Sequence, residues 1–113
     1  MTNLFRLFRH PEDLRDLTPD ELQEKLISNP VVIDVRTTRE FEAGHIAGAV
    51  SIPLGQESSA ITRWPADADV VLICKTGHRS QAAAATLLRQ GFRQVSHLKG
   101  GMDAWRRASK PVV

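Results

Sequence analysis

The sequence predicts an α/β domain in which a parallel β-sheet is covered by helices on both faces. Two apolar runs, residues 31–33 and residues 70–73, have the length and branched side chains of strands that are buried on both sides. Segments with helical spacing of apolar residues lie between and after these runs. Strands that alternate with helices are typical of βαβ units, whose strands run parallel.

Length and charge exclude several classes of protein. The 113 residues correspond to one domain that can bury a core without disulfides. Its 15 Lys and Arg residues are interspersed with 13 Asp and Glu residues, so we expect no nucleic-acid partner. No run approaches the roughly 20 apolar residues of a membrane span. The single cysteine fits a reducing compartment, and with no signal-peptide pattern we expect a cytoplasmic protein.

Three segments divide the chain. We expect an N-terminal arm or short helix over residues 1–13, one domain over residues 14–108 and a tail over residues 109–113. Arg6 and Arg9 interrupt the apolar residues of the arm, so it lacks the unbroken apolar core of a signal peptide. The tail is expected to be frayed.

Two capping boxes predict where the first two helices begin. Thr18 and Glu21, with a proline between them, open a helix that Asn-Pro at residues 29–30 ends. Thr37 and Glu40 open a shorter helix that ends at a glycine.

The remaining elements are predicted from residue 49 onward. Residues 49–52 are typical of a short strand closed by a proline, and part of residues 54–68 is expected to be helical. Residues 80–90 form a helix with a C-terminal glycine cap. Residues 94–98 are a further short strand, and a Gly-Gly turn leads into a last helix over residues 102–107.

The only cysteine, Cys74, follows the apolar run of residues 70–73 and begins a short polar loop. Ligands of open α/β sheets bind beyond the carboxyl ends of the strands, where Cys74 lies. The helix that follows presents unpaired N–H groups and a positive dipole end, which favour an anion. Gly77 allows successive N–H groups to converge on one centre. The pattern therefore favours a reactive Cys74 thiolate over an inert packed thiol.

The candidate substrate-binding loop follows Cys74 and consists of Lys75, Thr76, Gly77, His78, Arg79 and Ser80. Its basic residues suit an anionic substrate. One cysteine and four scattered histidines give no metal-ligand spacing, so we expect no metal and no cofactor. Cysteine phosphatases have the pattern Cys-x5-Arg, whereas Cys74 and Arg79 form Cys-x4-Arg. The shorter loop suits a single extra sulfur atom on Cys74, which is a persulfide.

Three segments, in order, resemble the single-domain rhodaneses over roughly residues 17–105. They are VVIDVRTTREFEAGHIAGAVSIPL, VVLICKTGHRSQAAAATLLRQGF and VSHLKGGMDAW. The resemblance implies a five-stranded parallel sheet with helices on both faces. It also implies sulfur transfer, in which Cys74 takes the outer sulfur of thiosulfate, sulfite leaves, and a thiol or cyanide removes the sulfur from the persulfide.

The resemblance also suggests roles for individual residues. Loop N–H groups would hold the terminal sulfur, and the basic residues Lys75 and Arg79 point to thiosulfate rather than mercaptopyruvate. Asp34 and Arg36 are expected to support the site, Asp34 by binding loop amides and Arg36 by pairing with Glu40 or a neighbouring glutamate.

Three other functions remain open. The chain could be a persulfide carrier whose sulfur donor and acceptor are other proteins. It could be a phosphatase or arsenate reductase, which the short loop disfavours. It could also be a non-catalytic rhodanese-like binding module, although such modules lack the cysteine that this chain retains at Cys74.

Overall fold

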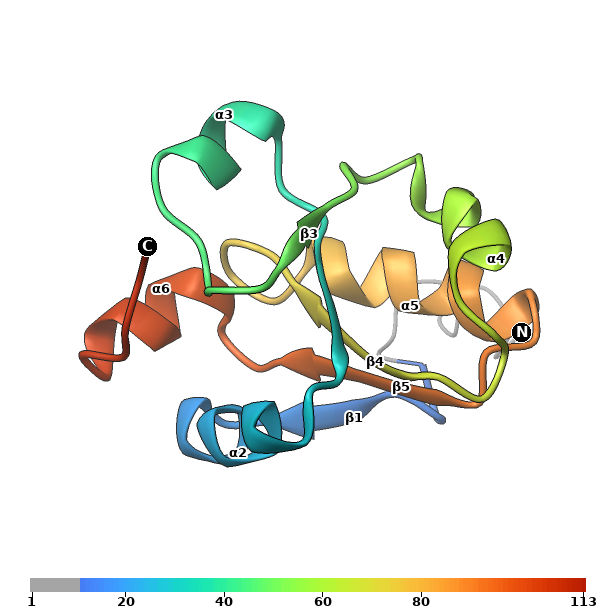
Figure 1. Cartoon of the computed structure of the whole chain (residues 1–113), viewed down its shortest axis with the longest axis horizontal. Coiled ribbons are helices and arrows are strands. Elements are labelled where there is room, and N and C mark those ends of the chain that lie inside the picture. The colour runs from blue at the N-terminus through green and yellow to red at the C-terminus, as the bar shows by residue number, and fades with distance from the viewer. Residues whose placement is uncertain (1–10) are drawn as a thin grey trace, which may run out of the picture.

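The computed structural model describes residues 11–113, so most of the predicted N-terminal arm lies outside the described residues. It confirms the predicted fold: a five-stranded, all-parallel sheet with strand order β1-β5-β4-β2-β3 (Figure 1). The strands are β1 (Arg15–Leu17), β2 (Val31–Asp34), β3 (Val50–Ser51), β4 (Asp69–Ile73) and β5 (Gln94–Leu98).

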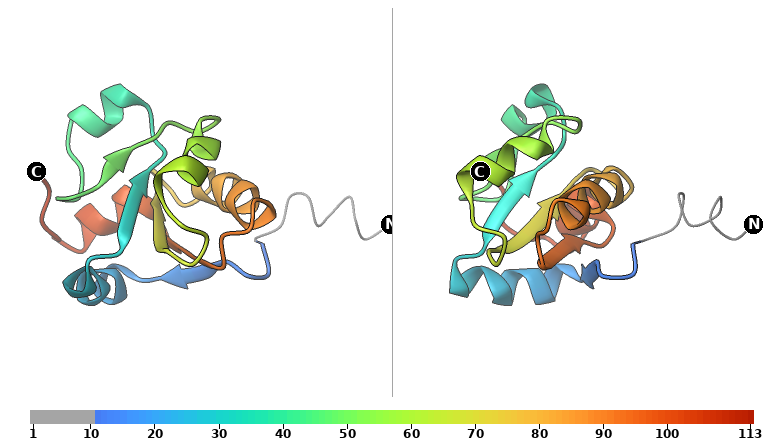
Figure 2. Two further views of the ribbon diagram at one scale, coloured as in Figure 1. Left: turned by 45° about the vertical axis from the view of Figure 1, so that its right-hand side comes forward. Right: turned by 90° about the vertical axis from the view of Figure 1, so that its right-hand side faces the viewer.

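Helices cover both faces of the sheet (Figure 2). The α-helices are α2 (Pro19–Lys25), α3 (Thr38–Glu42), α4 (Ala60–Arg63), α5 (Arg79–Arg89) and α6 (Gly101–Arg107), and short 3-10 turns are η1 (Leu26–Ser28) and η2 (Glu57–Ser59). Among residues 11–113, no helix has the length and apolar character to cross a bilayer.

The alternation of β4 side chains divides the core into two clusters. Val70 and Leu72 pack with α4 and α5 on one face, while Val71 and Ile73 pack with α2 and α6 on the other. All four side chains are fully buried, as expected for a central strand between two helical layers. Burial of each such side chain contributes about 1.5–3 kcal/mol, so β4 anchors the segment that carries Cys74.

Both predicted capping boxes are present. The Thr18 hydroxyl accepts the Glu21 N–H at 3.1 Å, and the Glu21 carboxylate accepts the Thr18 N–H at 2.9 Å. The equivalent distances between Thr37 and Glu40 are 3.2 and 3.0 Å. These reciprocal bonds satisfy N–H groups that the first helical turn leaves unpaired.

Strand β1 was not among the elements predicted from hydrophobic pattern. It has three residues, two of them charged, and its side chains are mostly exposed. Such a strand has no alternation of apolar and polar residues that would predict it. It forms by pairing with β5. In the parallel register Asp16 lies beside His97, which becomes important in the active site.

The predicted frayed tail is wrong. Val113 and His45 exchange two backbone hydrogen bonds of 3.1 and 2.9 Å. The buried Trp105 donates its indole N–H to the Pro111 carbonyl at 2.7 Å. The tail is therefore held both to α6 and to the segment that follows α3, and the bond to Pro111 gives the buried indole the partner that it needs.

Candidate active site

Cys74 follows the last residue of β4, and its side chain is fully buried. The Gly77 N–H donates a hydrogen bond to the Cys74 sulfur at 2.9 Å. Sγ also lies 3.4 Å from the Ser80 hydroxyl oxygen, to which the thiol donates. Helix α5 begins at Arg79, so the sulfur lies under a loop that ends in a helix N-terminus. The loop thus places a backbone N–H group and a helix N-terminus next to the sulfur.

The loop is held from behind by the start of α6. The Met102 N–H donates to the Cys74 carbonyl at 2.8 Å, and the Asp103 N–H donates to the Lys75 carbonyl at 3.0 Å. Gly101 has φ +60°, and a Cβ there would lie 2.5 Å from the Lys75 carbonyl carbon. The Gly-Gly turn is therefore needed for α6 to approach the loop backbone closely enough to bind its carbonyls.

Alanines form the face of α5 that packs against the sheet. Ala83 and Ala84 are fully buried in the cluster that also contains Leu72 and Cys74. Small side chains at these positions let the helix axis lie near β4, which fixes the helix N-terminus relative to the sulfur.

Arg79 is engaged by a carboxylate from a distant part of the chain. Its guanidinium binds Glu40 of α3 through two hydrogen bonds of 2.7 and 3.0 Å. These bonds, reinforced by the Thr37 amide, overcome desolvation and lower the pKa of Glu40 from 4.5 to about 2. The same bonds raise the pKa of Arg79, which stays charged.

The other basic residues of the loop also have partners. The Lys75 ammonium lies 3.1 Å from both carboxylate oxygens of Asp103 and is about half exposed. The His78 Nδ1 atom lies 3.0 Å from the Thr76 hydroxyl. Lys75, Thr76 and His78 are exposed, whereas Gly77 and Ser80 are buried next to the sulfur. The structure thus separates an outer charged rim from an inner layer that contacts Cys74.

Arg36 does not pair with Glu40 or a neighbouring glutamate, so that prediction is wrong. It binds Asp34 through Nε at 2.9 Å and Nη2 at 2.7 Å, and both side chains are buried. A buried carboxylate at the end of β2 needs a nearby cation, whereas Glu40 is already bound by Arg79. Asp34 also accepts the backbone N–H of Arg36 at 3.1 Å, which is not an amide of the active loop.

The Asp34–Arg36 pair shapes the segment that leads to the rim. Arg36 Nη2 also donates to the Gly44 carbonyl at 2.8 Å, just beyond α3. This hydrogen bond joins the segment before α3 to the segment after it, and α3 carries Glu40. The Asp34–Arg36 pair is thus connected to the segment beyond α3, the helix whose Glu40 carboxylate binds Arg79.

Two polar residues near Cys74 were not among the predicted site residues. His97 of β5 is buried, with Nδ1 2.7 Å from the Ser80 hydroxyl and Nε2 2.7 Å from Asp16 Oδ1. A histidine two positions after Val95, on the same face of a buried strand, is the signal that could have indicated its inward orientation.

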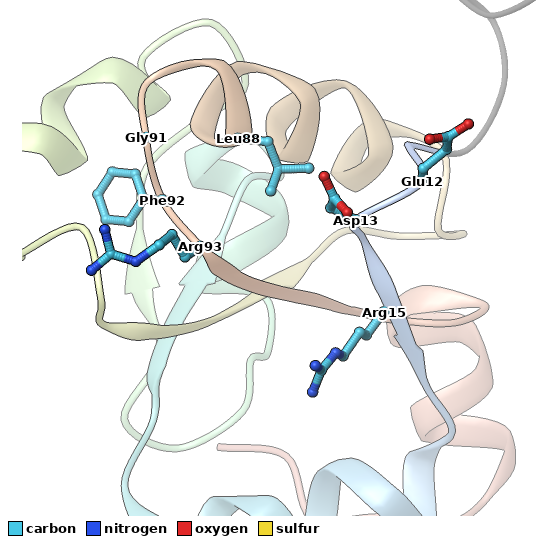
Figure 3. Close-up of a pocket in the computed structure, with 7 residues that line it drawn as sticks. All are labelled: Glu12, Asp13, Arg15, Leu88, Gly91, Phe92 and Arg93. Atoms are coloured by element: carbon cyan, nitrogen blue, oxygen red, sulfur yellow. The ribbon is translucent and has the colours of Figure 1, made fainter.

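Two pockets lie at opposite ends of α5. One, of about 300 Å³, is next to the active loop and is lined by Asp16, Thr76, Gly77, His78, Gln81, His97, Lys99 and Gly100. The other, of about 480 Å³, lies near the far end of the helix and includes Leu88 and Phe92 (Figure 3). The larger pocket has no residue of the active loop in its lining. Residues 11–113 hold no cluster of three or more potential metal-ligating side chains.

Comparison with known families matches residues 18–108 to the rhodanese-like domain. The chain belongs to the rhodanese-like family. The match includes β2, the active loop and α6.

Relatives of similar length are named sulfurtransferases. A sulfurtransferase of Allochromatium vinosum is 32% identical, over 88% of this chain and 95% of the relative. The thiosulfate sulfurtransferase GlpE of Ectopseudomonas mendocina is 35% identical, over 83% of this chain and 86% of the relative. A putative sulfur carrier protein of Bacillus subtilis, YrkF, is 38% identical over 66% of this chain and 40% of its own length.

Solved structures agree with the fold. A rhodanese-related protein of Thermoplasma volcanium has a TM-score of 0.78 at 30% identity, covering 88% of this chain and 97% of the other. A protein of unknown function from Rhodopseudomonas palustris, described as a possible tyrosine phosphatase, has a TM-score of 0.77 at 31% identity, covering 88% and 85%.

Proposed function

We propose that this protein transfers a sulfane sulfur from a small anionic donor, such as thiosulfate, to a thiophilic acceptor through a persulfide on Cys74. The observation that carries the proposal is the 2.9 Å hydrogen bond from the Gly77 N–H to the Cys74 sulfur, at the start of α5. A sulfur atom held by backbone N–H groups is stabilised as an anion, and both the thiolate and the persulfide are anions.

The reaction has two steps. The Cys74 thiolate attacks the outer sulfur of thiosulfate, a new S–S bond forms, and the bond to the sulfonate sulfur breaks so that sulfite leaves with its electron pair. An acceptor thiolate or cyanide then attacks the outer sulfur of the persulfide. Its S–S bond breaks, the electron pair returns to Cys74, and the sulfur leaves on the acceptor. This is covalent catalysis that needs no metal or redox cofactor.

The loop length supports sulfur transfer over phosphate chemistry. Five positions separate a phosphatase cysteine from its arginine, but only four separate Cys74 from Arg79. Arg79 is moreover engaged by both carboxylate oxygens of Glu40, whereas a phosphatase needs its arginine for the phosphate. The active loop, residues 75–80, would hold the outer sulfur mainly through N–H groups.

Intact mass spectrometry tests the proposal. After incubation with thiosulfate the protein should gain one sulfur atom, and cyanide should remove it and form thiocyanate. Cys74→Ser should gain nothing. Wild-type protein that gains no sulfur from any donor would point to a non-catalytic binding module, and release of phosphate from an aryl phosphate would favour a phosphatase.

A persulfide carrier is the second candidate. Lys75 and Arg79 each have a carboxylate partner, so the rim attracts a small anion less strongly than two free cations would. A relative named as a putative sulfur carrier is consistent with this role. A carrier should turn over slowly with thiosulfate and cyanide and exchange sulfur rapidly with a partner protein that carries a persulfide in the cytoplasm.

A further inference from the structure

A continuous row of polar groups leads away from the Cys74 sulfur. Sγ lies 3.4 Å from Ser80 Oγ, Ser80 Oγ lies 2.7 Å from His97 Nδ1, and His97 Nε2 lies 2.7 Å from Asp16 Oδ1. The first three residues are buried, and the Asp16 side chain is 42% exposed. The register explains the alignment, because Asp16 and His97 are paired across β1 and β5.

Two arrangements of donors and acceptors connect Cys74 to His97 through the Ser80 hydroxyl, and in a third the Ser80 O–H donates to the Gly77 carbonyl at 3.3 Å. An ionised Asp16 only accepts, so His97 donates to it through Nε2–H. When His97 is neutral, Nδ1 accepts the Ser80 O–H, and the Ser80 oxygen accepts the Cys74 S–H. When His97 is charged, Nδ1–H donates to the Ser80 oxygen, and the Ser80 O–H points to a Cys74 thiolate. The two states have the same total charge and differ by one shifted proton.

We propose that His97, held by Asp16, takes up the proton of the resting Cys74 thiol through the hydroxyl of Ser80. The Cys74 S–H bond breaks as its proton moves to the Ser80 oxygen, and the original Ser80 proton moves to His97 Nδ1. The products are a thiolate, an unchanged hydroxyl and an imidazolium paired with the Asp16 carboxylate. Ser80 contacts the reacting sulfur, whereas His97 and Asp16 act through it and are positioning residues.

This proposal rests on the proposed function, since only a thiolate attacks a sulfur donor. It adds a route by which the buried thiol can lose its proton. The pocket of about 300 Å³ beside the loop is lined by both His97 and Asp16, and the Asp16 side chain is 42% exposed, so the far end of the row reaches solvent. Two other cationic or titratable side chains line that pocket, His78 and Lys99, and they oppose the charged form of His97. The carboxylate of Asp16, at 2.7 Å, favours it.

The thiolate can be measured directly by its far-ultraviolet absorbance. The chain has one cysteine and no tyrosine, so no phenolate overlaps the signal. We expect the wild-type protein to show thiolate absorbance at neutral pH. In His97→Asn and Ser80→Ala the thiolate fraction at neutral pH, measured by this absorbance, should fall several-fold.

His97→Asn and Ser80→Ala replace buried side chains, so a variant with an unperturbed core is also needed. Asp16→Asn serves this purpose, because Asp16 lies on the edge strand β1 and its side chain is 42% exposed. Like the two buried variants, Asp16→Asn should have a smaller thiolate fraction at neutral pH than the wild type. Asp13→Asn removes the same charge from an exposed position nearby and should leave the signal unchanged. A wild-type absorbance profile in both Asp16→Asn and folded His97→Asn would overturn the proposal, as would an equal effect of Asp13→Asn.

The two proposals fail in different experiments. If the wild-type protein gains no sulfur but its thiolate signal depends on His97, then sulfur transfer is refuted and the proton route stands. If the wild-type protein gains sulfur while the signal ignores His97 and Asp16, then the proton route is refuted and sulfur transfer stands.

Discussion

Substitution of Gly101 by alanine should damage both stability and the active loop. The added Cβ would meet the Cys74 carbonyl oxygen and would lie 2.5 Å from the carbonyl carbon of Lys75. Both are backbone atoms, so no side chain can rotate away to relieve the contact. The start of α6 must therefore move away from the loop and weaken the hydrogen bond from Met102 to the Cys74 carbonyl.

The magnitude has two sources. A non-glycine residue at the left-handed φ of +60° costs about 1–2 kcal/mol, and overpacking of a closely packed site costs about 1–3 kcal/mol. Gly101→Ala should therefore lower the free energy of unfolding by about 2–5 kcal/mol. Displacement of the loop by about 1 Å should also slow sulfur uptake by about 10²-fold in the protein that remains folded.

Gly91→Ala is the matched control. Gly91 has φ +100°, so alanine there is at least as strained as at Gly101, but a Cβ would meet nothing within 4 Å. Urea unfolding of both variants gives the free energies, and mass spectrometry at low urea gives the rate of sulfur uptake. If Gly101→Ala is no less stable than Gly91→Ala and takes up sulfur at the wild-type rate, then close contact between α6 and the loop is not required.

Two further predictions concern the ion pairs. Glu40→Gln should cost less than about 1 kcal/mol, because the pair with Arg79 is partly exposed. The folded-state pKa of Glu40, about 2, lies below its ordinary 4.5, so the difference in unfolding free energy should be full above about pH 4.5 and vanish as the pH falls toward 2. A constant difference across that range would contradict the pairing. Arg36→Met should cost about 3–5 kcal/mol in thermal or urea unfolding because it leaves Asp34 buried and unpaired, whereas the exposed Arg39→Met should change stability by less than about 0.5 kcal/mol. Equal losses of stability in Arg36→Met and Arg39→Met would contradict the buried pairing of Arg36 with Asp34.

Local patterns were sufficient for most of the fold. The capping boxes at Thr18 and Thr37 marked two helix starts, and the apolar run before Cys74 marked the central strand, because both signals depend on residues close together in the chain. Strand β1 and the docked tail could not be found in this way. Each is stabilised by hydrogen bonds to a partner far along the chain, such as that between His45 and Val113.

The candidate site, like the fold, could be predicted only where its residues lie close together in the sequence. Cys74, Gly77 and the start of α5 lie within one short segment, so the hydrogen bond from the Gly77 N–H to the sulfur followed from their order. The pairing of Arg79 with Glu40 and of His97 with Asp16 did not, because each joins elements whose proximity is set by the sheet order. A charged residue in a loop shows that a charge is available, but only the fold shows which partner it binds.

The central claim is that Cys74 carries the sulfur. The most direct measurement is the intact mass of the wild-type protein and of Cys74→Ser after incubation with thiosulfate and removal of excess donor. We predict a gain of one sulfur atom in the wild type, its loss on addition of cyanide, and no gain in Cys74→Ser. An unchanged wild-type mass, or an equal gain in Cys74→Ser, would contradict the claim.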